Sequence, residues 1–207
     1  MPDLCCIEAL RQTSPDRVTV CLSDGEEIKA TLNVVADLRL YAGCELEEEA
    51  LRKLREASSL ALTRGRALEL LSRRPMSAKE LYDKLLRKGE PETNAAAAVR
   101  WLLDNHLLDD ESYASAVTRH YAAKGYGAGR IRTELRRRGV ERELWDEALE
   151  NRPDGQEKLD KFIASRLRDP EDREQVRKLS AALFRRGWSW EEIRSALRRY
   201  SVEPEDE

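Results

Sequence analysis

The sequence predicts a mainly α-helical protein, built from three tandem three-helix repeats in an elongated, curved array that follows a small β module. Three observations predict this fold. Apolar residues alternate with other residues near the N-terminus, they take helical spacing from about residue 58 onward, and one leucine–glycine frame recurs three times. The composition agrees, because 41% hydrophobic and 37% charged residues suit thin helical layers better than one thick core.

The first part of the chain has the pattern of a β-hairpin. Apolar residues recur with a period of two along residues 17–22 and again along residues 28–32, and Ser23-Asp24-Gly25 lies between the two runs. Glycine supplies the positive φ of a tight turn, so this pattern predicts a hairpin. Residues 4–10 would add a third strand, which a sheet this small needs for its stability.

An acidic helix is expected after Gly43. The apolar residues that have helical spacing there are Leu46, Ala50, Leu51 and Leu54. The three glutamates at 47–49 would lie in the first turn, where the helix dipole favours negative charge. We therefore expect an N-terminal domain over residues 1–57, made of a hairpin or three-stranded sheet and this helix.

One frame of two apolar residues and a glycine recurs three times, with offsets of 50 and then 48 residues between copies. Its residues are Leu81, Leu85 and Gly89; Ile131, Leu135 and Gly139; and Leu179, Leu183 and Gly187. Each apolar pair lies on one helix face, and each glycine suits a left-handed C-cap. A helix precedes each copy, and another apolar pair follows each glycine. We therefore expect helical repeats at residues 58–107, 108–153 and 154–202, and an acidic tail at 203–207.

The totals exclude several classes of protein. The net charge is −3, and no stretch approaches the roughly 18 apolar residues that a membrane span needs. Residues 1–10 lack the basic flank and apolar run of a secretory signal, so we expect a cytoplasmic protein without membrane contact. All four cysteines lie in the first 44 residues without a C-x-x-C spacing, and we expect free thiols that are buried or half-buried.

Basic residues cluster in the middle repeat, where eight bases and two acids lie between residues 119 and 142. If the two apolar residues of the frame point inward, a helical projection turns Arg136 and Arg137 outward and sets Arg132 beside the core. The first and third copies have Leu86 and Phe184 at the position of Arg136. This change toward charge favours a binding face on the middle repeat.

Tyr126 lies beside this cluster, within a glycine-rich run at residues 125–129. Stacking on a base or a guanidinium and packing in the core are both open for its ring. The glycines follow a helical pattern, and the chain has no Gly-Lys-Ser/Thr sequence, so a phosphate-binding loop is not expected. We expect a flexible turn between helices instead.

Several conspicuous residues have structural roles as the simplest interpretation. The basic residues that precede the three C-cap glycines are Lys88, Arg138 and Arg186, and we expect them to stabilise helix C-termini. Trp145 takes a core position. Trp188 and Trp190 flank Ser189, a candidate N-cap, and we expect one of the two indoles to be exposed.

The sequence predicts no catalytic, cofactor or metal site. His106 and His120 lack both a paired metal ligand and a nucleophile with an acid partner. The acidic run at residues 109–111 opens a helix, where carboxylates cap free backbone N–H groups. We therefore expect a protein that acts by binding and is not an enzyme.

The repeats resemble those of the RecX family. The runs that carry the resemblance are Ser77-Ala78-Lys79-Glu80-Leu81 with Leu85-Leu86-Arg87-Lys88-Gly89, then Leu107-Leu108-Asp109-Asp110-Glu111-Ser112-Tyr113-Ala114, the segment 125–139, and Arg185-Arg186-Gly187-Trp188 with Ile193. They cover about residues 60–200. The Asp-Asp run between two repeats is the most specific of them. The N-terminal β segment is similar to an extension that some members have.

The resemblance implies a modulator of the RecA recombinase in DNA repair. It implies binding to RecA filaments on single-stranded DNA and inhibition of their ATPase and strand exchange, without catalytic residues or cofactors. Our candidate contact residues are Arg130, Arg132, Arg136, Arg137, Tyr126, Arg87 and Arg185. The alternative is a stand-alone nucleic-acid-binding repeat protein, which would bind DNA without RecA and lose affinity steeply with salt. In either case we expect a monomer.

Overall fold

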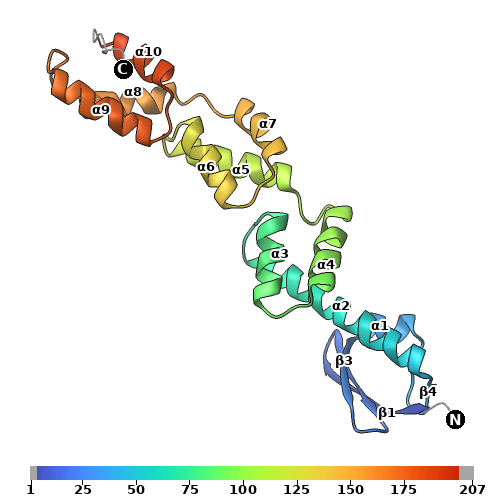
Figure 1. The fold of residues 1–207 in the computed structure, drawn as a ribbon. Helices are drawn as coiled ribbons and strands as arrows, with labels where there is room; N and C mark the ends of the chain where they lie inside the picture. Colours follow the sequence, from blue (N-terminus) through green and yellow to red (C-terminus); the bar gives the residue numbers. More distant parts are fainter. Residues whose placement is uncertain (1–3, 201–207) are drawn as a thin grey trace. The chain divides into compact units, whose positions relative to one another are not determined.

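A computed structural model describes residues 4–200 of the chain, which are mainly helical (Figure 1). They divide into two compact units. The first contains the residues up to 75 together with 81–108, and the second contains residues 76–80 together with the chain from 109 onward. The expected acidic tail at 203–207 lies outside the described residues. Among those described, no helix has the length and apolar character to cross a membrane.

The N-terminal sheet is antiparallel and has four strands in the order β3-β2-β1-β4. The strands are β1 (Cys5–Ser14), β2 (Arg17–Leu22), β3 (Glu27–Thr31) and β4 (Glu45–Leu46). The predicted hairpin is confirmed, with Gly25 at φ 87° in its turn. The third strand expected at residues 4–10 is present as β1, and a fourth strand that the sequence pattern did not indicate, β4, joins the sheet. The turn at Gly43, whose N–H donates to the Ile7 carbonyl at 2.7 Å, returns the chain to β1 and allows β4 to pair there.

A short helix, α1 (Leu32–Asp37), begins at residue 32, where the second strand of the hairpin was expected to end. Thr31 is its N-cap and its Oγ1 accepts a hydrogen bond from the Val34 N–H at 3.4 Å. This cap ends the alternation, so Leu32 is exposed although it continues the period of two. The four cysteines are free thiols, Cys21 buried and the others half-buried, as expected.

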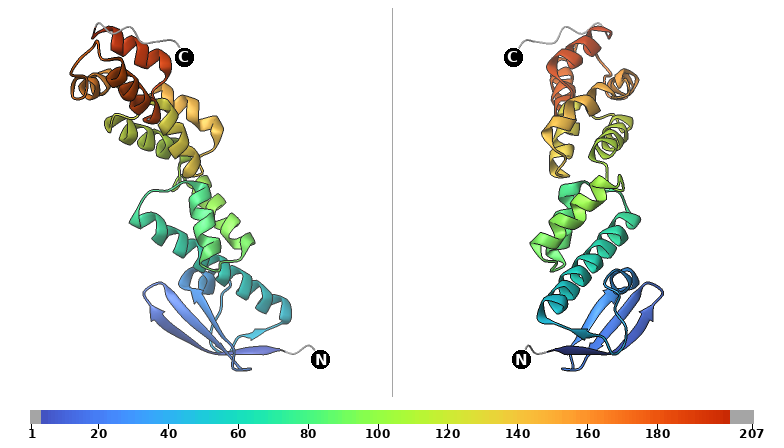
Figure 2. Two further views of the ribbon diagram at one scale, coloured as in Figure 1. Left: turned by 60° about the vertical axis from the view of Figure 1, so that its left-hand side comes forward. Right: turned by 90° about the vertical axis from the view of Figure 1, so that its right-hand side faces the viewer.

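The expected acidic helix and the first helix of the first repeat are one element, α2 (Glu48–Arg73). The expected boundary between residues 57 and 58 falls inside it. Its first part buries Leu51 and Leu54 against the sheet, which α1 and α2 cover on one face (Figure 2). Farther along, its Ser59 Oγ accepts a 2.8 Å hydrogen bond from the Asn94 amide. Helix α2 therefore joins the sheet and the first repeat in one unit.

The three predicted three-helix repeats are confirmed. After α2, the first has α3 (Ala78–Arg87) and α4 (Glu92–Asp104). The second has α5 (Asp110–Ala123), α6 (Ala128–Arg137) and α7 (Trp145–Glu150), with a 3-10 turn at Arg142–Leu144. The third has α8 (Gln156–Ala164), α9 (Arg173–Arg185) and α10 (Trp190–Arg198).

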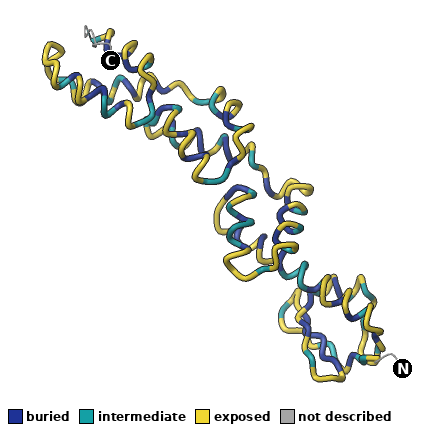
Figure 3. Tube along the Cα trace, viewed as in Figure 1, coloured by how far each residue is buried: buried dark blue, intermediate teal, exposed yellow. Residues whose placement is uncertain are grey.

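The recurring frame has the same two roles in each repeat: its apolar pair fills the core, and its glycine ends the second helix. All six of its apolar residues are at most 4% exposed, and the buried residues lie where the helices of a repeat meet (Figure 3). Its three glycines have φ values of 83°, 70° and 86°, which confirms the predicted left-handed C-caps. The second helix of each repeat therefore ends at a fixed place, and the next residues turn back toward the core.

Candidate partner-binding surface

The candidate arginines of the middle repeat lie on α6. Ile131 and Leu135 are fully buried, so the helix turns Arg136 and Arg137 to solvent, as the helical projection predicts. Arg132, which the projection sets beside the core, is exposed as well. Their orientation is therefore confirmed, whereas their contact with a partner stays a prediction.

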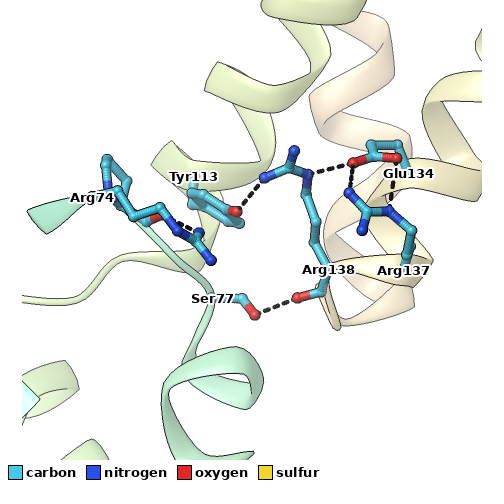
Figure 4. A network of polar contacts seen from close by, with 7 residues as sticks. Arg74, Ser77, Tyr113, Glu134, Arg137 and Arg138 are labelled. Carbon is cyan, nitrogen blue, oxygen red and sulfur yellow. Dashed lines mark hydrogen bonds and ion pairs between the residues drawn. The ribbon is translucent and has the colours of Figure 1, made fainter. Parts of the chain in front are cut away.

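Glu134, which was not among the residues predicted for the site, is buried on the same helix with only 4% of its side chain exposed. Its carboxylate accepts hydrogen bonds from Arg137 Nε and Nη2, at 3.1 and 2.6 Å, and from Arg138 Nε at 2.7 Å (Figure 4). Arg138 Nη1 donates in turn to the Tyr113 hydroxyl at 2.8 Å. Hydrogen bonds from Arg137 and then Arg138 lower the pKa of Glu134 to about 2, although burial acts in the opposite direction. Its position three residues after Ile131 was the signal that could have placed it inward.

The arginines of α6 differ in how far their charge is neutralised by acids of the same chain. Arg137 and Arg138 are held by Glu134, and Arg132 lies 3.8 Å from a carboxylate oxygen of Asp146. Arg136 lies over the indole of Trp145, with its Cζ 5.6 Å from the ring centroid. Arg130 forms no ion pair with any residue of the described range 4–200. Arg130 and Arg136 are therefore the α6 arginines whose charge is least neutralised within the chain.

The two carboxylates of the Asp-Asp run cap two different helices. Asp109 is the N-cap of α5 and accepts a hydrogen bond from the Ser112 N–H at 2.9 Å. Asp110 accepts one from the Ala78 N–H, also at 2.9 Å, at the start of α3. Burial raises the pKa of Asp110 despite this bond. The predicted capping role is confirmed, and residues 4–200 contain no group of three or more His, Cys, Asp or Glu placed to hold a metal ion.

Ser77 joins the start of α3 to the C-terminal end of α6. Its hydroxyl donates a 2.5 Å hydrogen bond to the carbonyl of Arg138 and accepts one from the Glu80 N–H at 3.1 Å (Figure 4). Residues 76–80 therefore belong to the second unit, although they open the second helix of the first repeat.

The glycine-rich turn before α6 is a contact between the second and third repeats. The N–H groups of Gly127 and Gly129 donate to the carbonyls of Arg186 and Gly187, both at 2.9 Å. A Cβ on Gly127 would lie 2.2 Å from the Gly187 oxygen, so the two backbones meet where a side chain would not fit. The turn between helices exists as predicted, and its glycines permit this close packing.

Arg186 closes this contact. Its guanidinium lies between the rings of Tyr126 and Phe162, at 4.6 and 4.8 Å from their centroids. It also donates to the carbonyl of Lys124 at 2.8 Å and to that of Gly125 at 3.3 Å. The expected role at a helix C-terminus is thus present, but on α5 instead of its own helix. Of the two roles that the sequence left open for Tyr126, stacking and core packing, the structure shows stacking on a guanidinium of the same chain.

The remaining candidates lie in other elements. Arg87, at the end of α3 in the first unit, is exposed and its Nε donates to the Asp83 carbonyl at 3.2 Å. Arg185 is exposed at the end of α9, beside the close contact with α6. Of the two indoles near Ser189, Trp188 is buried and Trp190 is exposed, as expected. Ser189 forms a capping box with Glu192, which confirms the predicted N-cap.

The first two repeats match models of known protein domains. Residues 64–102 match the model of the first three-helix domain of RecX, and residues 109–149 match that of the second. A regulatory protein RecX of Vibrio parahaemolyticus is 34% identical over 155 residues, which are 73% of this chain and 97% of that protein. One from Vibrio campbellii is 36% identical over 143 residues, which are 68% of this chain and 90% of the relative.

Solved structures show the same fold. A crystal structure of a regulatory protein RecX is similar with a TM-score of 0.75 and 25% identity, and the match covers 94% of this chain and 99% of that one. The RecX structure from Lactobacillus salivarius is similar with a TM-score of 0.62 and 22% identity, over 70% of this chain and 98% of the other.

Proposed function

Because this chain belongs to the RecX family of regulatory proteins, we propose that it binds filaments of the RecA recombinase on single-stranded DNA and inhibits their ATPase and strand exchange. It acts by contact alone and without a cofactor, as a cytoplasmic monomer in DNA repair and recombination. The family, and not the geometry, supplies RecA as the partner.

One observation of the structure supports a site for this contact. The three repeats share a frame, and at one exposed position of that frame the middle repeat has Arg136 where the others have Leu86 and Phe184. Around Arg136 the other arginines are held in order, since Glu134 fixes Arg137 and Arg138. A fixed arginine face binds phosphates or carboxylates at a lower entropic cost than mobile side chains do.

The test is the RecA ATPase on single-stranded DNA, with and without the chain, beside co-sedimentation of the chain with the filaments. We expect the ATPase rate to fall as the chain is added and the chain to pellet only when filaments form. A chain that neither pellets with filaments nor changes the ATPase contradicts the proposal. Sedimentation velocity of the chain alone tests the monomer, whose mass is 23.8 kDa.

The stand-alone nucleic-acid-binding protein is the second candidate function. It predicts that the chain binds DNA without RecA and does not change the ATPase of preformed filaments. Binding of the chain to DNA in the absence of RecA, measured beside the ATPase of preformed filaments, separates the two functions.

A further inference from the structure

Helix α10 has an exposed line of one aromatic and two basic side chains. Trp190, Arg194 and Arg198 follow one another at intervals of four residues, so they lie along one side of the helix, and all three are exposed. At one end of the line, the ring of Trp190 stacks on that of Phe184 of α9, with centroids 5.3 Å apart. We refer to these four side chains as the α10 surface. Phe184 is 52% and Trp190 39% exposed, and an aromatic pair that stays exposed beside charges is typical of an interaction surface.

The core of the third repeat keeps this surface turned to solvent. Ile193, Ala196 and Leu197 are fully buried and fix which side of α10 faces the core, so the helix cannot turn to cover the arginines. The capping box of Ser189 fixes the first turn of the helix and with it the backbone of Trp190. The α10 surface is therefore preformed, and a segment that covers it has to come from outside the helices that carry it.

Bases are in excess around the third helix of the third repeat alone. From the start of its second helix to the end of its third, the first repeat has five bases and five acids, and the second repeat has six of each. The same segment of the third repeat, α9 to α10, has seven bases and three acids, an excess of four positive charges. Two of those acids already have basic partners, since Glu174 is paired with Lys178 and Glu192 with Arg152. The third repeat therefore attracts an acidic segment more strongly than the other two repeats do.

An acidic run follows α10 directly in the sequence. Residues 203–207, which lie outside the described part of the chain, have the sequence Glu-Pro-Glu-Asp-Glu and carry four negative charges. Their charge is equal and opposite to the excess of the segment α9 to α10. Because the run belongs to the same chain, its effective concentration beside α10 is on the order of millimolar. Charge and tethering together favour this run over a separate acidic partner at lower concentration.

The run also fits the length of the α10 surface. From Trp190 to Arg198 the helix rises about 12 Å, at roughly 1.5 Å per residue. The seven residues 201–207 span up to about 23 Å when extended, which leaves enough length for the chain to turn back. Arg194 and Arg198 are about 6 Å apart along the helix, and two residues of extended chain cover nearly the same distance. Pro204 disfavours helical backbone at Glu203, which favours the extended form.

We propose that the acidic run 203–207 folds back and covers the α10 surface, with its carboxylates beside Arg194 and Arg198. Exposed ion pairs are individually weak and are screened by salt, so the contact is reversible. The run acts as an intramolecular competitor, because an anionic ligand of this surface has to displace it first. This regulation goes beyond the proposed function and does not require RecA.

The test measures how strongly iodide quenches the fluorescence of Trp190. Iodide is an anion, so the arginines attract it and the acidic run excludes it. Each protein is compared with its own W190F form, and the difference isolates Trp190 from the other tryptophans. In the neutral-run variant, E203Q/E205Q/D206N/E207Q, we expect the quenching constant of Trp190 to rise about twofold or more at low ionic strength. At about 0.5 M salt the variant and the unaltered chain should give the same value, because screening releases the run.

A double-variant cycle tests the role of the arginines. Neutralising the run in the background R194Q/R198Q should leave the quenching of Trp190 unchanged, because the run no longer has a site on α10. The matched control removes four exposed acids from the first unit, in the variant E8Q/E45Q/E47Q/E48Q, and should be quenched as the unaltered chain is. Circular dichroism should be native in every variant, since none of the charge substitutions lies in the core.

Three results would overturn the proposal. The first is equal quenching of the neutral-run variant and the unaltered chain at low ionic strength. The second is a rise of the same size with and without R194Q/R198Q, which would mean that the run repels iodide without contacting α10. The third is a rise that appears only at high protein concentration, which would mean that the run of one molecule covers the surface of another. None of these outcomes depends on the RecA assays.

Discussion

The carboxylate of Glu134 and the guanidinium of Arg138, one helical turn apart on α6, form a 2.7 Å hydrogen bond in which the acid is almost fully buried. The same arginine donates to Tyr113 of α5, and its carbonyl accepts from Ser77. Arg138, whose guanidinium the buried acid orients, therefore joins the C-terminal end of α6 to two other segments of the second unit. Among the exposed arginines of α6, Arg137 depends on this acid for its position.

We predict that Glu134→Gln destabilises the second unit in a pH-dependent way. The pKa of Glu134 is about 2 in the folded chain and 4.5 ordinarily, so the ionised form stabilises the fold. This stabilisation is complete above about pH 4.5 and is lost as the pH falls through about 2. At pH 7 we expect a loss of about 1–2 kcal/mol, the usual effect of weakening a hydrogen-bonded charge, measured by urea unfolding.

The control for this prediction is Glu174→Gln, which removes an exposed carboxylate that is paired with Lys178 on α9. Because solvent screens this pair, the variant should unfold at nearly the urea concentration of the unaltered chain. A difference between Glu134→Gln and the unaltered chain that stays constant from pH 7 to pH 2 would contradict the role assigned to the carboxylate.

We predict opposite effects for two glycine-to-alanine changes. At Gly127 the new Cβ would lie 2.2 Å from a backbone oxygen of Gly187, so the contact between the repeats must open, at a cost of about 1–3 kcal/mol or more. At Gly65, inside α2, a Cβ would meet no atom within 4 Å beyond the neighbouring helix backbone, and alanine should stabilise the helix by about 0.5–1 kcal/mol. Urea unfolding measures both. Equal effects of the two changes would mean that the close contact does not form in solution.

Arg186→Lys tests whether shape, in addition to charge, joins the second and third repeats. Lysine keeps the positive charge but loses the planar group that lies between Tyr126 and Phe162 and binds two carbonyls. We expect amide hydrogens near Gly127 to exchange faster and the free energy of unfolding to fall by about 1–2 kcal/mol. The neighbouring change Arg185→Lys, at an exposed side chain, should leave exchange unaltered. Similar exchange in both variants would show that charge alone is sufficient.

Much of the fold could be predicted from the sequence because local chemistry decides it. The Asp-Gly pair is sufficient for the hairpin, and the leucine–glycine frame is sufficient for the second helix of each repeat and its C-cap. Helix α1 and strand β4 could not be predicted in the same way. Leu32 continues the strand pattern, and only the choice of Thr31 as a cap breaks it. Strand β4 has two residues and exists only because β1 is beside it.

The site was predictable to a similar extent. The projection of α6 gives the exposure of Arg136 and Arg137, since an apolar pair fixes which side is inward. The network of Glu134 could be predicted from a different signal: Glu134 is a polar residue on the inward side of the helix, and arginines follow it three and four residues later. The role of Gly127 could not be predicted, because the atoms that exclude a side chain there belong to Gly187, sixty residues away in the sequence.

The last prediction concerns the proposed contact with RecA. Arg136→Leu installs the residue of the first repeat, keeps an apolar cover on Trp145, and leaves Glu134 with both its arginines. If Arg136 is a contact, the concentration for half-inhibition of the RecA ATPase should rise about fivefold or more, since an arginine at the centre of an interface contributes roughly 1 kcal/mol or more. Stability should change little, as is usual for an exposed side chain.

Two other arginines make that result interpretable. Arg100→Leu changes an exposed arginine of α4 and should inhibit as the unaltered chain does. Arg137→Leu also removes an exposed charge but takes a partner from the buried Glu134, so it should lower the urea midpoint even if inhibition changes little. Loss of inhibition with loss of stability therefore indicates damage to α6. Loss of inhibition in Arg136→Leu at unchanged stability indicates a contact, and full inhibition by that variant would mean that the binding face is elsewhere.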